Sequence, residues 1–281
     1  MVVCGGIPAR AGLGVPASGS PRGRRGPTHA GLLQTRSRDG EPRAQDALPD
    51  RGRARWPPVP LCLRPARLAD RRTPTCLEGR NLAGAATGVV DAERQLGAHR
   101  IKAGDVIIGM PASGFHANGF SLVRHIIKTA KLSLEAHVSE YGKTSGEVFL
   151  TPTEIYTLDC LALIKSMPEH LHAFSHITGG GIAENTARVI PAHLTATYDR
   201  STWALPVEME FMAQMGGVPQ ADMERTWNCG IGMSAFVDPS VADLTLRSLA
   251  ARGMKAWVAG VVTERKGSDP RSTLEGSYQA R

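Results

Sequence analysis

The sequence predicts an α/β domain of the α+β two-layer type that begins near residue 77 and ends near residue 265. Two observations lead to this prediction. A strand, a glycine-bearing polar loop and a helix follow one another twice, and further strands and helices alternate around these two units. A third observation sets the boundary, because residues 1–76 show no lasting helical or alternating apolar pattern.

One strand–loop–helix unit contains three consecutive glycines, Gly179–Gly181. Residues 172–177 read as a short strand, and apolar residues recur at helical spacing from Ala183 until Pro191 ends the pattern. Glycines let a backbone approach an anion closely, and the free N–H groups of a helix start point toward it. The unit therefore predicts an anion site, although a tight strand-to-helix turn is the alternative.

The other unit places two polar side chains in a loop. A buried-type strand over 105–110 leads into the loop 111–119, and a helix follows over 121–132. His116 and Asn118 lie in this loop, between Ser-Gly and Asn-Gly pairs. Loops commonly carry functional residues, so both are candidates, and ordinary surface positions are the alternative.

The remaining elements are expected from periodicity and from capping residues. Residues 82–90 read as a strand, and Pro152 marks the start of a helix. A glycine-interrupted stretch over 223–233 predicts either backbone contact with a ligand or a strand bulge. The helix after Pro152 is expected to bury Ile155, Leu158, Leu161, Ala162 and Ile164; the other expected elements are a helix over 208–215, a strand over 233–237, a helix over 239–252 capped by Gly253, and a strand over 256–262.

The positive net charge of +7 belongs to the first part of the chain. Residues 1–76 hold 14 arginines, no lysine and five acids, whereas the remainder is mildly acidic, at −2. Three interpretations of 1–76 are open: a disordered basic tail that touches RNA or a membrane, a targeting presequence, or an out-of-frame product of a GC-rich gene. The near absence of aromatic residues and the Arg/Pro/Gly/Ala composition favour the third.

Several classes of protein are disfavoured by the sequence. The five cysteines are scattered without a Cys-x-x-Cys pair, which indicates a reduced, cytoplasmic setting. There is no apolar run long enough for a membrane span, and neither a secretory signal nor a nucleic-acid-binding domain is expected. His170, His172 and His176 cluster in the sequence, but without a carboxylate or cysteine nearby we expect solvated loop histidines rather than a metal site.

Five sequence segments occur in order along the chain: Gly104–Gly109, Ser113–Arg124, Leu150–Thr153, His176–Gly181 and Asn228–Met233. Together they resemble the aminoimidazole ribonucleotide synthetases, the phosphoribosylformylglycinamidine cyclo-ligases of purine biosynthesis. The resemblance covers about residues 77–265 and is specific because five motifs agree in order.

The resemblance implies an ATP- and Mg²⁺-dependent cyclisation of formylglycinamidine ribonucleotide. It suggests that His116 and His176 are catalytic, either in proton transfer or in stabilising the transferred phosphoryl group. Family members also form homodimers. The implied ligand contacts are Ser113, Gly114, Asn118, Thr178, Gly179, Gly180, Gly181, Asn185 and Asn228.

The chain also departs from the family pattern. Two N-terminal segments associated with ATP and magnesium are missing, so 77–100 is expected to be a remnant of the N-terminal ATP-binding domain, 101–265 the C-terminal domain and 266–281 a flexible tail. Homodimerisation is doubtful for the same reason. The alternative function is an inactive remnant, or a phosphate-binding domain without the N-terminal site.

Overall fold

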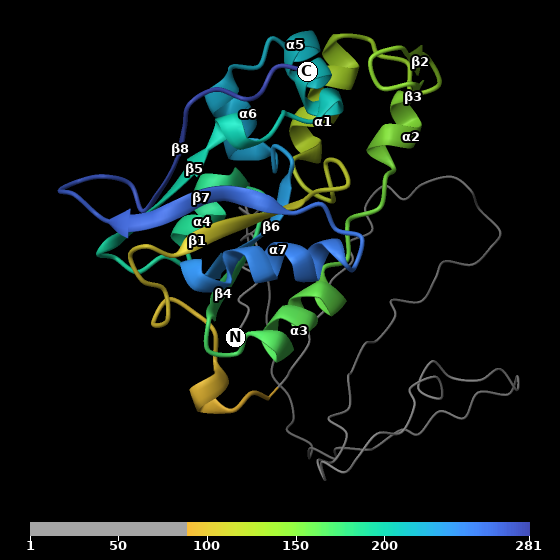
Figure 1. Ribbon diagram of the computed structural model, residues 1–281. Helices are drawn as coiled ribbons and strands as arrows, with labels where there is room; N and C mark the ends of the chain where they lie inside the picture. Colours follow the sequence, from red (N-terminus) through yellow and green to blue (C-terminus); the bar gives the residue numbers. More distant parts are fainter. Residues whose placement is uncertain (1–88) are drawn as a thin grey trace, which may run out of the picture. The chain divides into compact units, whose positions relative to one another are not determined.

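The computed structural model describes residues 89–281, and these form one unit built around a six-stranded sheet (Figure 1). The strand order is β4-β6-β1-β7-β5-β8, and a separate hairpin pairs β2 with β3. The strands are β1 (Val106–Pro111), β2 (His137–Val138), β3 (Lys143–Thr144), β4 (Leu171–His176), β5 (Leu194–Asp199), β6 (Ile231–Val237), β7 (Trp257–Glu264) and β8 (Ser272–Glu275).

Seven α-helices and three short 3₁₀ turns connect these strands within the described residues. The 3₁₀ turns are η1 (Ala92–Arg94), η2 (Arg200–Thr202) and η3 (Pro239–Val241). The helices are α1 (Phe120–Thr129), α2 (Ser145–Phe149), α3 (Thr157–Ser166), α4 (Gly181–Ala187), α5 (Val207–Gly216), α6 (Gln220–Thr226) and α7 (Ala242–Ala250).

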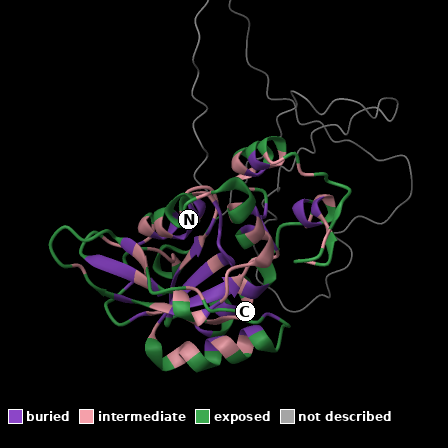
Figure 2. Cartoon of the chain, turned by 90° about the horizontal axis from the view of Figure 1, so that it is seen from above, coloured by how far each residue is buried: buried purple, intermediate pink, exposed green. Residues whose placement is uncertain are grey.

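The α/β class that the sequence predicts is confirmed, but helices cover both faces of the sheet. Neighbouring residues of one strand point to opposite faces, and Ile107 and Ile108 accordingly belong to two different apolar clusters. One cluster contains residues of α1, α4, α5 and α6, and the other contains residues of α3 and α7. Buried residues concentrate in the strands between these helices (Figure 2), so the domain has three layers rather than two.

Helix α3 differs most from its predicted form. The helix begins at Thr157, and residues 151–156 before it have no regular secondary structure. The residues that pack inward are Tyr156, Leu163 and Met167. The prediction of a buried face was therefore wrong for Ile155, Leu158, Leu161 and Ile164, which are exposed.

Three elements in the second half of the chain were not expected. Strand β5 falls in a stretch that carries no prediction, and β8 lies within the expected tail at 266–281. Helix α6 occupies the first part of the glycine-interrupted stretch over 223–233, for which no helix is predicted. Strand β8 pairs in parallel with β5, from Ser272 opposite Ala196 to Glu275 opposite Asp199. Most of the strand predicted over 82–90 lies outside the described residues, as do residues 1–76.

A buried histidine–aspartate pair joins β4 to the residue that precedes β1. His172 Nδ1 lies 2.7 Å from Asp105 Oδ2, and both side chains are almost fully buried, so the expectation of a solvated loop histidine is wrong for His172. The same carboxylate oxygen accepts a hydrogen bond from the Lys102 amide at 2.9 Å. Because a buried polar group is costly without a partner, the pair fixes the approach of residues 102–105 to the sheet.

We predict that His172→Ala lowers the free energy of unfolding by about 3 kcal/mol, since it leaves the Asp105 carboxylate buried without its partner. Urea denaturation measures this. The control is His170→Ala, which removes an exposed histidine two residues away and should cost less than about 0.5 kcal/mol. Equal effects of the two variants would show that the buried pair does not stabilise the fold.

Candidate active site

The sheet topology brings two separate loops to the same edge. Strands β1 and β4 both run antiparallel to β6, and Met110 and His176 flank Met233 from its two sides. The loop after β1 and the loop after β4 therefore leave the sheet together, beside the start of β6. Predicted site residues from distant parts of the sequence are gathered there for this reason.

His116 lies in the loop after β1 and has an unusual backbone conformation. Its φ of 57° falls in the left-handed region, and the residue is only 4% exposed. The Ser113 amide donates a hydrogen bond to His116 Nε2 at 3.1 Å. An accepting Nε2 carries no proton, so the neutral ring has its proton on Nδ1. Nδ1 is buried and has no hydrogen-bond partner among the described residues.

The electrostatic surroundings keep both histidines neutral. Burial lowers the pKa of His116 to about 4, with a smaller contribution from the neighbouring His176. Burial also lowers the pKa of His176. At neutral pH the site therefore holds two uncharged imidazoles, which can donate and accept hydrogen bonds without adding positive charge.

Tyr156 lies close to both histidines, and it is not among the residues that the sequence predicts for the site. Its ring centroid is 6.2 Å from that of His116 and 6.4 Å from that of His176. Its hydroxyl donates to the Pro111 carbonyl at 2.7 Å. A Cβ on Gly232 would collide with the Tyr156 hydroxyl and lie 2.6 Å from His116 Cε1, so the rings pack directly on backbone.

The register of β6 changes at this point. Met110 pairs with Met233, but Pro111 pairs with Ile231, so one residue of β6 is passed over. This irregularity matches the strand bulge expected for the glycine-interrupted stretch. The bulge places Gly232, with no side chain, beneath the aromatic ring.

Asn228, Ser113 and Gly114 hold the loop after β1 in place. The Asn228 side chain donates to the Gly114 carbonyl at 2.8 Å and accepts from the Gly230 amide at 2.9 Å. The Ser113 hydroxyl donates to the Pro152 carbonyl at 2.7 Å. Asn228 is buried, and both ends of its amide are bonded within the chain, so its position serves loop geometry.

The three glycines after β4 differ in the space around the position where a side chain would begin. A Cβ on Gly181 would collide with the Glu224 carbonyl, so α4 can pack on α6 only without one. Gly180 has a φ of 102°, and a Cβ there would overlap the Glu184 carboxylate. A Cβ on Gly179 would meet no atom within 4 Å. Backbone is thus open to a ligand at Gly179, while Glu184 brings negative charge beside Gly180.

Asn185 organises the triple-glycine loop from inside. Its amide nitrogen donates to the carbonyls of Thr178, Gly179 and Gly181, the last at 2.7 Å. Its carbonyl oxygen accepts from the Thr178 hydroxyl and from Arg188, each at 3.1 Å. The buried Asn185 amide is therefore fully used within the chain. Asn118, by contrast, is half-buried at the end of its loop.

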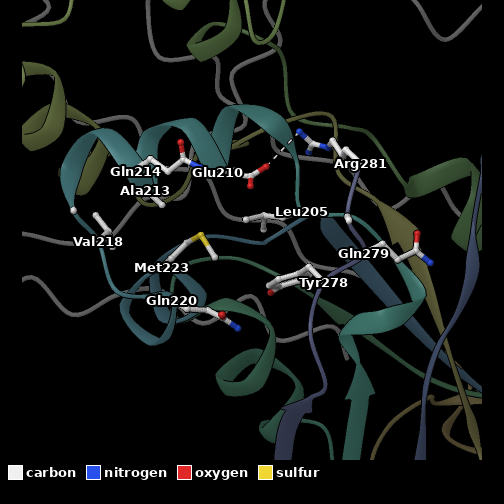
Figure 3. A pocket seen from close by; sticks show the side chains of 12 residues that line it. Leu205, Glu210, Ala213, Gln214, Val218, Gln220, Met223, Tyr278, Gln279 and Arg281 are labelled. Atoms are coloured by element: carbon white, nitrogen blue, oxygen red, sulfur yellow. Dashed lines mark ion pairs between the residues drawn. The ribbon is translucent and has the colours of Figure 1, made fainter.

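The described residues form no metal-ligand cluster, and one cavity of the domain lies away from the two histidines. Within residues 89–281, no group of three or more His, Cys, Asp or Glu side chains is arranged to hold a metal ion. None of the helices in this range has the length and apolar character needed to cross a bilayer. A cavity of about 740 Å³ lies between α5, α6 and the C-terminal segment, lined by Leu205, Met223 and Tyr278 among others (Figure 3).

The fold and the site define a mixed α/β domain that carries one buried imidazole, one half-buried imidazole and a glycine-rich loop at one sheet edge. Residues 102–271 match the family described as AIR synthase related protein, C-terminal domain. The chain belongs to this family. The match extends beyond the predicted boundary at 265 and includes Arg271, next to β8.

Relatives of known name are similar over the same region. A protein of Streptomyces fradiae, provisionally assigned as a phosphoribosylformylglycinamidine cyclo-ligase, is 47% identical over 182 residues, which is 63% of this chain and 99% of that protein. The phosphoribosylformylglycinamidine cyclo-ligase of Nitrosospira multiformis is 37% identical over 195 residues, covering 69% of this chain and 54% of the relative. The chain thus spans about half the length of the Nitrosospira enzyme.

Solved structures resemble the chain more distantly. The hydrogenase maturation protein HypE of E. coli is 23% identical, with a TM-score of 0.41 over 65% of this chain and 50% of that one. A thiamine-monophosphate kinase from Stenotrophomonas maltophilia is 15% identical, with a TM-score of 0.42 over 66% of this chain and 54% of that one. Similarity this low does not bear on activity.

We predict that Gly232→Ala lowers the free energy of unfolding by about 1–3 kcal/mol, because the added methyl displaces the Tyr156 and His116 rings. Chemical denaturation gives the value. Gly179→Ala is the matched control, since its methyl enters open space, and it should change stability by less than about 1 kcal/mol. The close packing would be refuted if Gly232→Ala were as stable as the wild type.

We also predict that stability falls as the pH is lowered from 6.5 toward 4. In this window the unfolded chain binds a proton at His116 that the folded chain does not, so protonation favours unfolding. Denaturation curves at a series of pH values measure the slope. The His116→Asn variant, whose side chain tolerates a positive φ, should flatten it; an unchanged slope would contradict the lowered pKa.

Proposed function

We propose that this chain acts in the ATP-dependent cyclisation of formylglycinamidine ribonucleotide to aminoimidazole ribonucleotide, a step of purine biosynthesis. The observation that carries the proposal is the convergence of His116 and His176 on Tyr156 and Gly232, within a domain of the AIR synthase related family. The names of the relatives support the choice of substrate. The expected setting is the cytoplasm, with no nucleic-acid or membrane partner.

In this proposal the two histidines have different roles. His116 is screened from solvent and has its proton on Nδ1, so it acts as a neutral hydrogen-bond donor toward a substrate oxygen once the loop 111–119 shifts. His176 is only partly buried and is the better candidate for moving a proton from the attacking nitrogen. Tyr156 keeps the two rings apart.

The remaining predicted contacts divide into those that face a ligand and those that hold the loops. Gly179 offers backbone beside open space, and Asn118 is half-buried in the other loop. Thr178 is half-buried next to Gly179, but its hydroxyl already donates to Asn185. Ser113, Gly114, Gly180, Gly181, Asn185 and Asn228 support these groups through hydrogen bonds and close packing.

The described residues do not fit a magnesium ion, since they offer no cluster of carboxylates. They fit a triphosphate poorly as well, because the Glu184 carboxylate lies against Gly180. The loop suits a single phosphate, with Arg188 as the nearby positive charge. We therefore assign no step to ATP or Mg²⁺ within residues 89–281, and their ligands belong elsewhere in an active assembly.

The alternative is a remnant that binds phosphate without turnover. The span of the chain, about half of the Nitrosospira cyclo-ligase, is consistent with this alternative. The test is turnover of formylglycinamidine ribonucleotide by the 281-residue chain with ATP and magnesium, beside the intact Nitrosospira enzyme. Phosphate binding without turnover would support the remnant, and measurable turnover would support the enzyme.

We predict that His176→Asn lowers kcat about 10²–10⁴-fold in an active preparation, because the transferred proton loses its acceptor. Steady-state kinetics provides the measurement. His125→Ala removes an exposed histidine on α1 and should leave kcat unchanged. Equal kcat values for His176→Asn and wild type would remove His176 from the mechanism.

A further inference from the structure

The side chain of Tyr156 turns inward from a segment that otherwise faces solvent. Glu154 and Ile155 before it and Thr157 after it are exposed, whereas Tyr156 is 4% exposed. Its hydroxyl donates to the carbonyl at the end of β1, and its ring lies on Gly232, where any Cβ would collide with the hydroxyl oxygen. The ring is therefore fixed at two points within the site.

The hydroxyl of Tyr156 is not free to act on a substrate. Its hydrogen is donated to the Pro111 carbonyl at 2.7 Å. Burial raises the pKa of this hydroxyl, and Glu154 and Cys160 add smaller contributions in the same direction. Because the hydroxyl keeps its proton and spends it within the chain, the ring is the part of Tyr156 that matters to the two histidines.

The ring of Tyr156 lies beside both imidazoles. Its centroid is 6.2 Å from that of His116, at an interplanar angle of 55°, and 6.4 Å from that of His176, at 64°. An aromatic ring at this position occupies space that water would otherwise fill. Water stabilises the protonated form of an imidazole, so its exclusion favours the neutral form. Burial is the largest cause of the lowered pKa of His116, and it also lowers the pKa of His176.

Nearby carboxylates do not explain neutral histidines. Glu208 on α5 lies beside the loop after β1, with its Oε1 3.8 Å from the position of a Cβ on Gly114. Negative charge of this kind raises the pKa of an imidazole. His176 lowers the pKa of His116, but by less than burial does. Titratable side chains on the neighbouring elements include Glu154 and Cys160 at α3, Glu184 on α4 and Glu208 on α5.

We infer that Tyr156 is a positioning residue of the site: its ring, anchored on Gly232 and on the Pro111 carbonyl, keeps water from the two imidazoles and so holds both in the neutral form. His176 must be neutral to accept a proton from the attacking nitrogen. Loss of the ring should therefore move the acid limit of activity to higher pH. This last consequence rests on the proposed function, whereas the protonation state of the histidines does not.

Histidine NMR titrations of the full 281-residue chain test the inference without any turnover. Tyr156→Phe keeps the ring and should leave the pKa of His116 near 4. Tyr156→Leu and Tyr156→Ala remove the ring, and each should raise that pKa by about one unit or more. The matched control is Leu163→Ala, which alters a buried residue of the same apolar cluster and should lower stability without moving the pKa.

The pH profile of kcat/KM gives a second measurement in an active preparation. Its acid limb should move to higher pH in Tyr156→Leu and keep its place in Tyr156→Phe. An unchanged His116 pKa in both Tyr156→Leu and Tyr156→Ala would overturn the inference. So would a rise of the same size in Leu163→Ala or in Tyr156→Phe. If the pKa rises as expected while the wild-type chain shows no turnover, the positioning role is upheld and the proposed function fails.

Discussion

The candidate site depends on the contact between the Tyr156 side chain and the backbone of Gly232. Because Gly232 has no Cβ, the ring enters the space above β6, and its hydroxyl reaches the Pro111 carbonyl at the end of β1. This bond draws residues 151–156 across the sheet edge. Helix α3 therefore begins only at Thr157 and turns Leu163 inward, which leaves the residues expected to be buried on its outer face. One close contact thus arranges the two imidazoles and also determines which face of α3 meets solvent.

The two loops at the site are held mainly by asparagine amides rather than by packing. Asn228 fixes the loop after β1, and Asn185 fixes the loop after β4, each through hydrogen bonds to backbone. Buried amides without partners would be costly, so both asparagines are committed to the fold. The groups left for a ligand are then few: the two imidazoles, the backbone at Gly179 and the half-buried Asn118.

Periodicity and glycine placement predict much of this structure, including β1, α1, β4, α4, α5, β6 and α7. The five motifs correctly indicate the family. The sequence could also have predicted β5, since Leu194, Ala196 and Tyr198 alternate with polar residues. Strand β8 has no such pattern and forms through pairing with β5. The sequence predicts the wrong buried face for α3, because periodicity shows only which residues are apolar. Which of them become buried depends on the elements that pack against the helix. No sequence pattern marks Tyr156 as a site residue, because its role comes from a contact with Gly232, which is 76 positions away.

The environment of His116 holds its ring neutral, with the proton on Nδ1, beside Tyr156. Nitrogen NMR spectra of the histidine-labelled chain, recorded as a function of pH and assigned with His116→Asn, measure both properties. We expect the Nδ1–H tautomer of His116 and a titration near pH 4. An Nε2–H tautomer, or a titration near the ordinary value of 6.5, would contradict it.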